Sequence, residues 1–215
     1  MLDPDRTLAL AYVPARHREA VRALWTLDAA LGAALTTGRE PAIRQIKLAW
    51  WREALERLDT APAPAEPVLQ ALETHVLPRG VAGGALAGLE EGWRMLLAGN
   101  LDGAALDIYA AERGGLLFRL TAQLLAASSP APNWGEGWAL ADLARNASDP
   151  GERNAALIAA WERLRDKGTS MPRAIRPLTM LAKLARRDAS CGLPFEPQGA
   201  PRRMAAMLAH RLTGR

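Results

Sequence analysis

The side chains that most often carry metal or nucleophilic chemistry are few and scattered in this chain. His17, His75 and His210 lie far apart, and none has a Cys, His or carboxylate at the spacing of a metal site. Cys191 is the only cysteine and has no local nucleophile signature. The glycine-rich stretch 80–84 lacks the Lys-Ser/Thr pair of a phosphate loop. These residues therefore predict neither a zinc site, nor a catalytic thiol, nor a nucleotide-binding loop.

Asp28 is the first polar residue that stands out from its surroundings. It occupies the same helical stripe as Val21, Leu24 and Leu31 in a helix expected over 15–35. An unpaired carboxylate on an apolar stripe is strongly unfavourable unless its pKa shifts and it becomes neutral. We therefore expect either a buried structural pair with an Arg or a helix-end amide, or a functional acid that faces a cavity.

A second polar group is formed by Asp142, Arg145, Asn146 and Asp149. Their spacing predicts that they share one face of a helix, because residues three and four apart are neighbours on a helix surface. Such a face is normally solvated. The alternative is that it lines a polar cavity.

The composition indicates which elements must position these side chains. The 215 residues include 44 Ala and 34 Leu but only 10 Val and Ile together, so helix-favouring residues far outnumber strand-favouring ones. Proline and glycine divide the chain into helical segments. We expect an all-α, single-domain helical bundle over residues 1–215. The predicted helices cover about 4–11, 15–35, 41–58, 68–76, 85–98, 104–127, 136–146, 154–167, 172–187 and 201–212.

Hydropathy, cysteine content and charge indicate where in the cell the protein is expected and what it could contact. No apolar run reaches the ~20 residues of a spanning helix. One cysteine forms no internal disulfide and no leader peptide is recognisable, so we expect a cytoplasmic protein. Residues 172–215 carry 9 basic and 2 acidic side chains, whereas residues 1–171 carry 18 and 21. This basic C-terminal segment predicts either a solvated helix face or a patch that attracts anionic lipid, nucleic acid or an acidic protein.

Five stretches of the chain resemble the squalene/phytoene synthase family. They are residues 3–14 (DPDRTLALAYVP), 23–28 (ALWTLD), 40–55 (EPAIRQIKLAWWREAL), 109–115 (YAAERGG) and 192–195 (GLPF), the last followed by an Arg-rich helix. The resemblance is strong over the first 60 residues and diffuse after them. It implies the all-helical isoprenoid (terpenoid) synthase fold, a bundle around a deep apolar cavity, in which active members join two prenyl diphosphates head to head.

The first aspartate-rich motif of that family is missing here. Ionisation of an allylic diphosphate needs Mg²⁺, and Mg²⁺ prefers carboxylate oxygens, so two acidic motifs face each other across the cavity mouth of an active member. Alignment of residues 23–28 with the first motif region puts Gly32, Ala33 and Thr36 at the positions of the metal-binding aspartates.

The second motif is incomplete. Asp142 matches a polar position and Arg145 matches the arginine of the family, but Asn146 stands where an Asp is expected and Pro150 replaces another. Asp149 is the one carboxylate left nearby. A single remaining acid does not hold the metal cluster that this ionisation requires.

The missing acids imply a non-catalytic relative, one that resembles the branch including a mitochondrial complex I assembly factor, in which the Trp-Trp-Arg-Glu signature at 50–53 is prominent. We therefore expect no catalytic residue, no metal and no cofactor. The expected partner is a hydrophobic isoprenoid or lipid ligand, or a protein of a membrane complex, and not nucleic acid. The basic C-terminal segment adds a peripheral contact with the inner membrane. Two alternatives stay open: an active prenyltransferase with an altered Mg²⁺ site, and an isoprenoid or lipid carrier.

Two sets of residues follow from the resemblance as expectations for the cavity. The first set contains residues that line the cavity or bind a ligand, with the reservation that the two tryptophans are more simply core residues: Asp28, Trp50, Trp51, Arg52, Tyr109, Asp142, Arg145, Asn146 and Asp149. The second set contains the residues bulky enough to fill the cavity: Trp25, Trp93, Trp138 and Trp161.

Overall fold

In a computed structural model of the chain, all the regular secondary structure among the described residues is helical, which confirms the all-α prediction. The structure describes residues 2–36, 40–97, 99, 101–128, 130–165 and 173–214. The first half contains α1 (Pro4–Ala11), α2 (Ala15–Thr36), α3 (Pro41–Arg57), α4 (Pro67–His75), η1 (Leu77–Arg79), α5 (Gly83–Arg94) and η2 (Met95–Leu97). The second half contains α6 (Gly103–Tyr109), η3 (Ala110–Gly115), α7 (Leu116–Leu124), α8 (Pro132–Asn146), α9 (Pro150–Leu164), η4 (Arg173–Ile175), α10 (Arg176–Cys191) and α11 (Pro201–Thr213).

Acidic caps followed by proline set the start of several helices. The Asp3 carboxylate accepts a hydrogen bond from the backbone N–H of Arg6, and α1 spans the predicted residues 4–11. Asp149 caps α9 in the same way by accepting from the N–H of Glu152. Because α8 ends at Asn146, the prediction that Asp149 shares a helix face with the residues of α8 is wrong.

The long helix predicted over 104–127 is interrupted. Its middle is a π-helical segment, η3, which separates α6 from α7. Glycines let two neighbours approach this segment closely. A Cβ on Gly92 of α5 would lie 2.6 Å from the backbone nitrogen of Arg113, and a Cβ on Gly114 would overlap the carbonyl of Gly135 in α8. The wider turn of η3 is thus held between α5 and α8, and it turns Arg113 into the interior, where its exposure is 0%.

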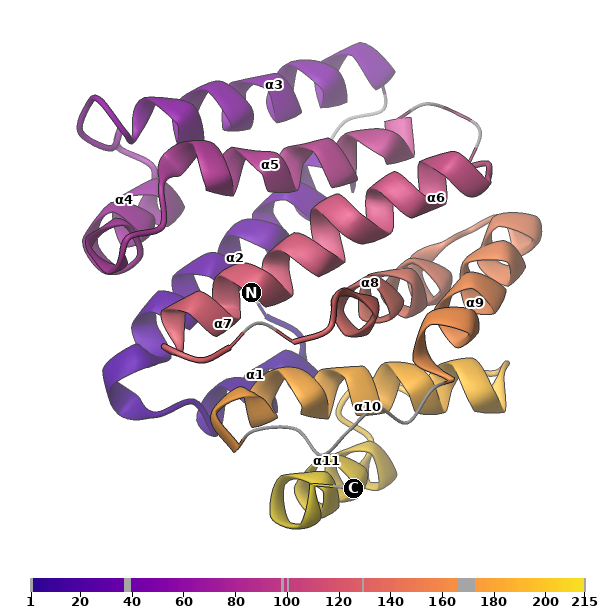
Figure 1. Cartoon of the computed structure of the whole chain (residues 1–215). Helices are drawn as coiled ribbons and strands as arrows, with labels where there is room; N and C mark the ends of the chain where they lie inside the picture. Colours follow the sequence, from indigo (N-terminus) through magenta and orange to yellow (C-terminus); the bar gives the residue numbers. More distant parts are fainter. Residues whose placement is uncertain are drawn as a thin grey trace.

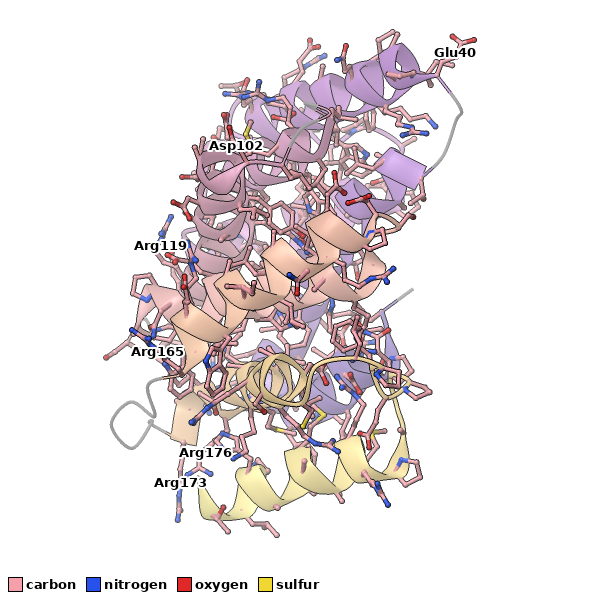
Figure 2. The ribbon with its side chains drawn as sticks, turned by 90° about the vertical axis from the view of Figure 1, so that its right-hand side faces the viewer. Glu40, Asp102, Arg119, Arg165, Arg173 and Arg176 are labelled. Atoms are coloured by element: carbon pink, nitrogen blue, oxygen red, sulfur yellow. The ribbon has the colours of Figure 1, made fainter. Side chains whose placement is uncertain are left out.

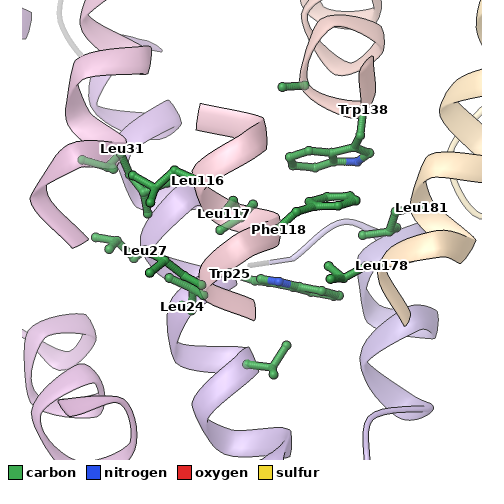
Figure 3. Packing of buried hydrophobic residues seen from close by; sticks show 14 of the residues in the cluster. Leu24, Trp25, Leu27, Leu31, Leu116, Leu117, Phe118, Trp138, Leu178 and Leu181 are labelled. Carbon is green, nitrogen blue, oxygen red and sulfur yellow. The ribbon is translucent and has the colours of Figure 1, made fainter. Parts of the chain in front are cut away.

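Aromatic residues from three helices form the centre of the core. In the view of Figure 3, Phe118 of α7 lies between Trp138 of α8 and Trp25 of α2. The Phe118 and Trp138 ring centroids are 5.6 Å apart. The Trp25 indole N–H donates to the Thr121 hydroxyl at 3.0 Å, which satisfies the one polar group of that buried ring. This packing joins the N-terminal and C-terminal parts of the bundle.

The C-terminal helices return to the N-terminus. Figure 1 shows α10 beside α1, and Figure 2 shows α11 below α10. Arg203 of α11 donates through Nη2 to Asp5 of α1 at 2.8 Å and pairs through Nη1 with Asp188 of α10 at 2.5 Å. Arg176 is also buried and donates to the carbonyls of His210 and Arg211. The expected basic C-terminal patch is therefore smaller than its sequence indicates, because two of its arginines are internal.

No helix among the described residues is both long enough and apolar enough to cross a membrane.

Candidate functional site

An open pocket of about 680 Å³ lies between α2, η2, α8 and the first turn of α9. Its volume is within the range of ~300–1,000 Å³ that ligand sites normally have. Six leucines are among the residues that line it: Leu2, Leu35, Leu96, Leu97, Leu101 and Leu143. Of the four tryptophans considered as filling residues, Trp93 lines the pocket, Trp25 and Trp138 are buried in the core, and Trp161 is 38% exposed on α9. The cavity is therefore open.

The wall contributed by α2 carries no acid. Ala29, Gly32, Ala33 and Thr36 face the pocket at helical spacing. A side chain at position 32 would also meet Trp93, because a Cβ there would lie 2.8 Å from Cη2 of the indole. This wall is the one to which the sequence resemblance assigns the first metal-binding motif.

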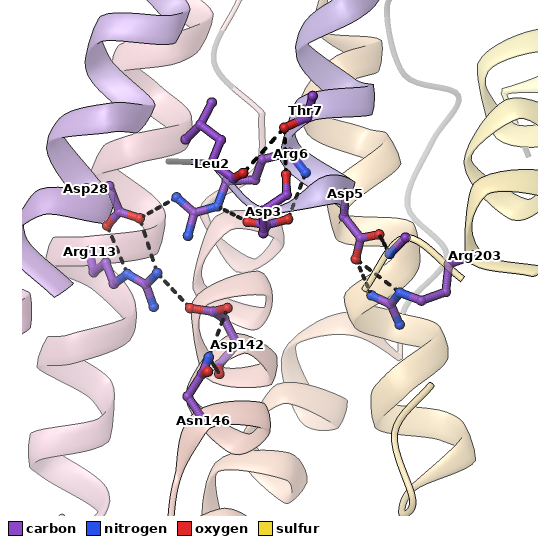
Figure 4. Close-up of polar contacts among 11 residues, drawn as sticks. Leu2, Asp3, Asp5, Arg6, Thr7, Asp28, Arg113, Asp142, Asn146 and Arg203 are labelled. Atoms are coloured by element: carbon purple, nitrogen blue, oxygen red, sulfur yellow. Dashed lines mark hydrogen bonds and ion pairs between the residues drawn. The ribbon is translucent and has the colours of Figure 1, made fainter. Parts of the chain in front are cut away.

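Asp28 lies one helical turn from this wall but is fully buried under the pocket floor. Its carboxylate accepts from Arg6 Nη1 at 2.8 Å, from Arg113 Nε at 3.0 Å and Nη2 at 3.1 Å, and from Trp93 Nε1 at 2.9 Å. Figure 4 shows the carboxylate between the two guanidinium groups. Of the two arrangements that the sequence allows, the structure shows the buried pair with arginine.

The charges around Asp28 hold it ionised. Burial by itself raises the pKa of Asp28, but the opposing charges of Arg113 and Arg6 and the hydrogen bonds from Arg113 and Trp93 lower it to about 2. The Arg113 guanidinium also lies over the Trp93 ring, 3.9 Å from its centroid. Burial raises the pKa of the neighbouring Tyr109 hydroxyl, which stays neutral.

A chain of alternating charges crosses the floor of the pocket. Arg6 Nε pairs with Asp3 at 2.8 Å on one side of Asp28. Arg113 Nη2 pairs with Asp142 at 2.7 Å on the other side. The order is therefore Asp3, Arg6, Asp28, Arg113, Asp142, in which each arginine lies between two carboxylates. The network is satisfied internally, as buried ions must be to persist.

The polar residues of the second region are divided between two sides of α8. Asp142, Asn146 and Asp149 line the pocket, and the Asn146 amide donates to the Asp142 carbonyl at 2.8 Å. Arg145 turns away and donates to the Asp188 carboxylate and to the carbonyl of Glu196, each at 2.7 Å. Thus the four polar residues do not share one helix face as predicted. The helix α8 ends before Asp149, and Arg145 binds the Asp188 carboxylate of α10 instead of facing the pocket.

Three predicted cavity residues on α3 lie outside the pocket. Trp50 is 45% exposed, so the expectation that it is a core residue is wrong. Trp51 is buried and contacts Trp50 edge to face, with centroids 5.2 Å apart. Arg52 pairs at the surface with Glu56 at 3.1 Å and with Glu91 at 3.4 Å. Tyr109, by contrast, lines the pocket as expected from the resemblance.

Sequence reasoning missed three residues that line the pocket: Arg6, Arg44 and Arg113. The one usable signal was the spacing of Arg113 four residues after Tyr109, which places the two on one helix face. Among the described residues, no group of three or more His, Cys, Asp or Glu side chains lies close enough together to hold a metal ion.

A sequence model of a known family matches most of this chain. The family is described as squalene/phytoene synthase, and the match covers residues 2–153. All five residues of the charge chain on the pocket floor fall within it. No curated protein and no solved structure gives a significant match.

Proposed function

The chain belongs to the squalene/phytoene synthase family and has an all-helical fold of the isoprenoid synthase type, and from this premise we propose that it is a binding protein that no longer condenses prenyl diphosphates. Its pocket takes a hydrophobic ligand of the isoprenoid or lipid class. No metal and no cofactor take part, and no residue acts as a catalyst.

The proposal rests on one observation: most carboxylates at or under the pocket are paired with arginines or cap a helix, and the α2 wall has none. Ionisation of an allylic diphosphate needs Mg²⁺ held by carboxylate oxygens. The α2 wall offers Ala29, Gly32, Ala33 and Thr36 instead. The nearest acid on that helix, Asp28, is buried and bonded to two arginines. The residues present therefore do not fit the metal cluster that the family chemistry needs.

Two acids of the opposite wall are engaged as well, because Asp142 pairs with Arg113 and Asp149 caps α9. Glu152, in the first turn of α9, is then a single further carboxylate on the pocket and does not make up a metal cluster. The replacement of acid by Asn at position 146 removes a further candidate ligand of a metal. What remains is a pocket lined by several leucines above a floor of paired charges, which suits a long apolar ligand with a small polar end.

Native mass spectrometry of the purified protein tests the binding function. The expected spectrum contains a fraction of protein carrying an apolar ligand that organic extraction removes. Ala29→Phe, which places a ring in the pocket, should abolish that fraction. Ala85→Phe, at an exposed site on α5, should leave it unchanged. A ligand fraction that is equal in the two variants would contradict binding in the pocket.

The outer face of α3 favours a second candidate function. In this function the protein assists the assembly of a respiratory membrane complex from the cytoplasmic side of the inner membrane. Ile43, Ile46 and Trp50 follow one another at steps of three and four, and they are 41%, 68% and 45% exposed. A contiguous exposed apolar face of this kind is typical of a protein interaction site. The occupant proposed is a subunit of such a complex.

Affinity purification from cells that express a tagged chain tests this second function. We expect identified subunits of one membrane complex to co-purify with the wild type and to be lost with Ile46→Asp. Ile108→Asp, at an exposed isoleucine on α6, is the control and should keep them. If both variants retain the subunits, the α3 face is not their docking site.

A further inference from the structure

A groove between α9 and α10 combines an aromatic ring with basic side chains. Its volume is about 380 Å³, and it is lined by Trp161, Lys183, Arg186, Arg187 and Ser190. Trp161 is 38% exposed, and Ile158, one turn earlier on α9, is 53% exposed. In Figure 2, α9 runs across the front of the molecule and ends beside Arg165. An aromatic ring, an isoleucine and three cations therefore meet on one accessible surface.

Two of the three cations in this groove have no ion-pair partner among the residues that the structure describes. Arg187 pairs with Glu196 at 2.8 Å. Lys183 and Arg186, however, have no carboxylate within ion-pair distance in the part of the chain that the structure describes. Arg186 Nη2 instead donates to the carbonyl of Arg165 at 3.2 Å, which fixes its guanidinium between the two helices. Glu162, exposed on α9, does not line the groove.

We propose that this groove is a peripheral contact for a negatively charged lipid surface. Trp161 and Ile158 lie at the boundary between headgroups and acyl chains, where indole rings and apolar side chains are favoured. Lys183 and Arg186 lie at the level of the lipid phosphates. The contact is independent of the occupant of the main pocket, because the two sites share no residue.

The apolar residues are what favour lipid over the other polyanions. A nucleic acid backbone or an acidic protein segment would use the cations but would leave Ile158 in water. The basic surface is also smaller than the charge of the last 44 residues implies, since Arg176 and Arg203 are buried and cannot contact a membrane. Lipid contact is therefore expected from one groove and not from the whole C-terminal segment.

Co-sedimentation with vesicles tests the proposal directly. Wild-type protein should bind vesicles of phosphatidylcholine with phosphatidylglycerol, and binding to pure phosphatidylcholine should be weak. Each cation near an anionic membrane contributes about fivefold in affinity, so Lys183→Gln with Arg186→Gln should weaken binding by about 25-fold. The matched control is Arg57→Gln with Arg119→Gln, which removes two exposed charges on α3 and α7 and should change binding little. Equal losses in the two double variants would overturn the proposal.

Cys191, the single cysteine of the chain, provides a second readout because it is exposed and follows Ser190 of the groove. A polarity-sensitive fluorophore on Cys191 should shift to the blue with anionic vesicles, less so in Trp161→Ala, and the shift should decrease as salt increases. Inorganic phosphate at the same ionic strength should give no shift. A shift with phosphate alone, or tighter binding of a single-stranded oligonucleotide than of the vesicles, would show that the groove is an anion or nucleic acid site and would overturn the proposal.

Discussion

Replacement of Asp28 by Asn is the sharpest perturbation of the charge chain under the pocket. The change keeps the size of the side chain and removes its charge. It leaves Arg113, which is 0% exposed, and Arg6, which is 8% exposed, without the carboxylate that they share. Each arginine keeps one other acid: Asp3 lies 2.8 Å from Arg6 and Asp142 lies 2.7 Å from Arg113.

The expected loss follows from these contacts. Breaking a buried ion pair by removal of one partner costs about 3–5 kcal/mol. Because each arginine keeps one acidic partner, we expect the free energy of unfolding to fall by the lower value, about 3 kcal/mol. The pKa of Asp28, lowered from 3.8 to about 2, gives a consistent figure of about 2 kcal/mol for the ionised form alone. Both values are a large part of the ~5–15 kcal/mol by which domains are normally stable.

Urea unfolding at pH 7, followed by tryptophan fluorescence and helix circular dichroism, measures the loss. Asp107→Asn makes the same chemical change at a carboxylate that is 68% exposed and paired with Arg163, so it should cost less than ~1 kcal/mol. The double variant Asp28→Leu with Arg113→Met should recover much of the loss, because apolar residues of similar size replace the buried pair. A loss below ~1 kcal/mol for Asp28→Asn, with an unchanged denaturant slope, would refute the reasoning.

Three further predictions concern the same region. Gly32→Ala should lower the free energy of unfolding by about 1–3 kcal/mol because the new methyl group meets Trp93, whereas Gly103→Ala, whose Cβ would have open space, should not lower it. Trp93→Phe should lower it by about 1 kcal/mol, since the indole hydrogen bond to Asp28 is lost while the ring under Arg113 is kept. The pKa of Asp28 is lower in the folded state, so its contribution to stability is complete above about pH 5 and is lost as pH falls toward 2. The urea midpoints at pH 5 and pH 2.5 should therefore differ more for the wild type than for Asp28→Asn.

The helices of this fold could be predicted because their signals are local. Asp3 and the proline after it define the start of α1, and an excess of Ala and Leu over β-branched residues excludes a sheet. The π-helical segment η3 could not be predicted. It depends on close approach of Gly92 and Gly135, which come from helices before and after it in the sequence.

The candidate site was predictable only in part, for a similar reason. The apolar stripe of α2 shows that Asp28 needs a partner, but the partner, Arg113, is 85 residues away. Trp50 was expected in the core because it is large and apolar, and sequence alone does not reveal that no described element covers that face of α3. The four-residue spacing of Asp142 and Asn146 predicts a shared helix face, and since α8 contains both, both line the pocket; that this face meets a pocket and not solvent depends on the packing of the other helices.

The central claim is that the pocket binds without condensing prenyl diphosphates. Incubation of the purified protein with farnesyl or geranylgeranyl diphosphate, Mg²⁺ and a reductant, followed by mass spectrometry of the organic extract, tests it most directly. The arrangement of Gly32, Ala33 and Thr36 on the α2 wall predicts no C30 or C40 product above the boiled-protein background. A condensed product formed by the wild type in proportion to protein concentration would contradict the account.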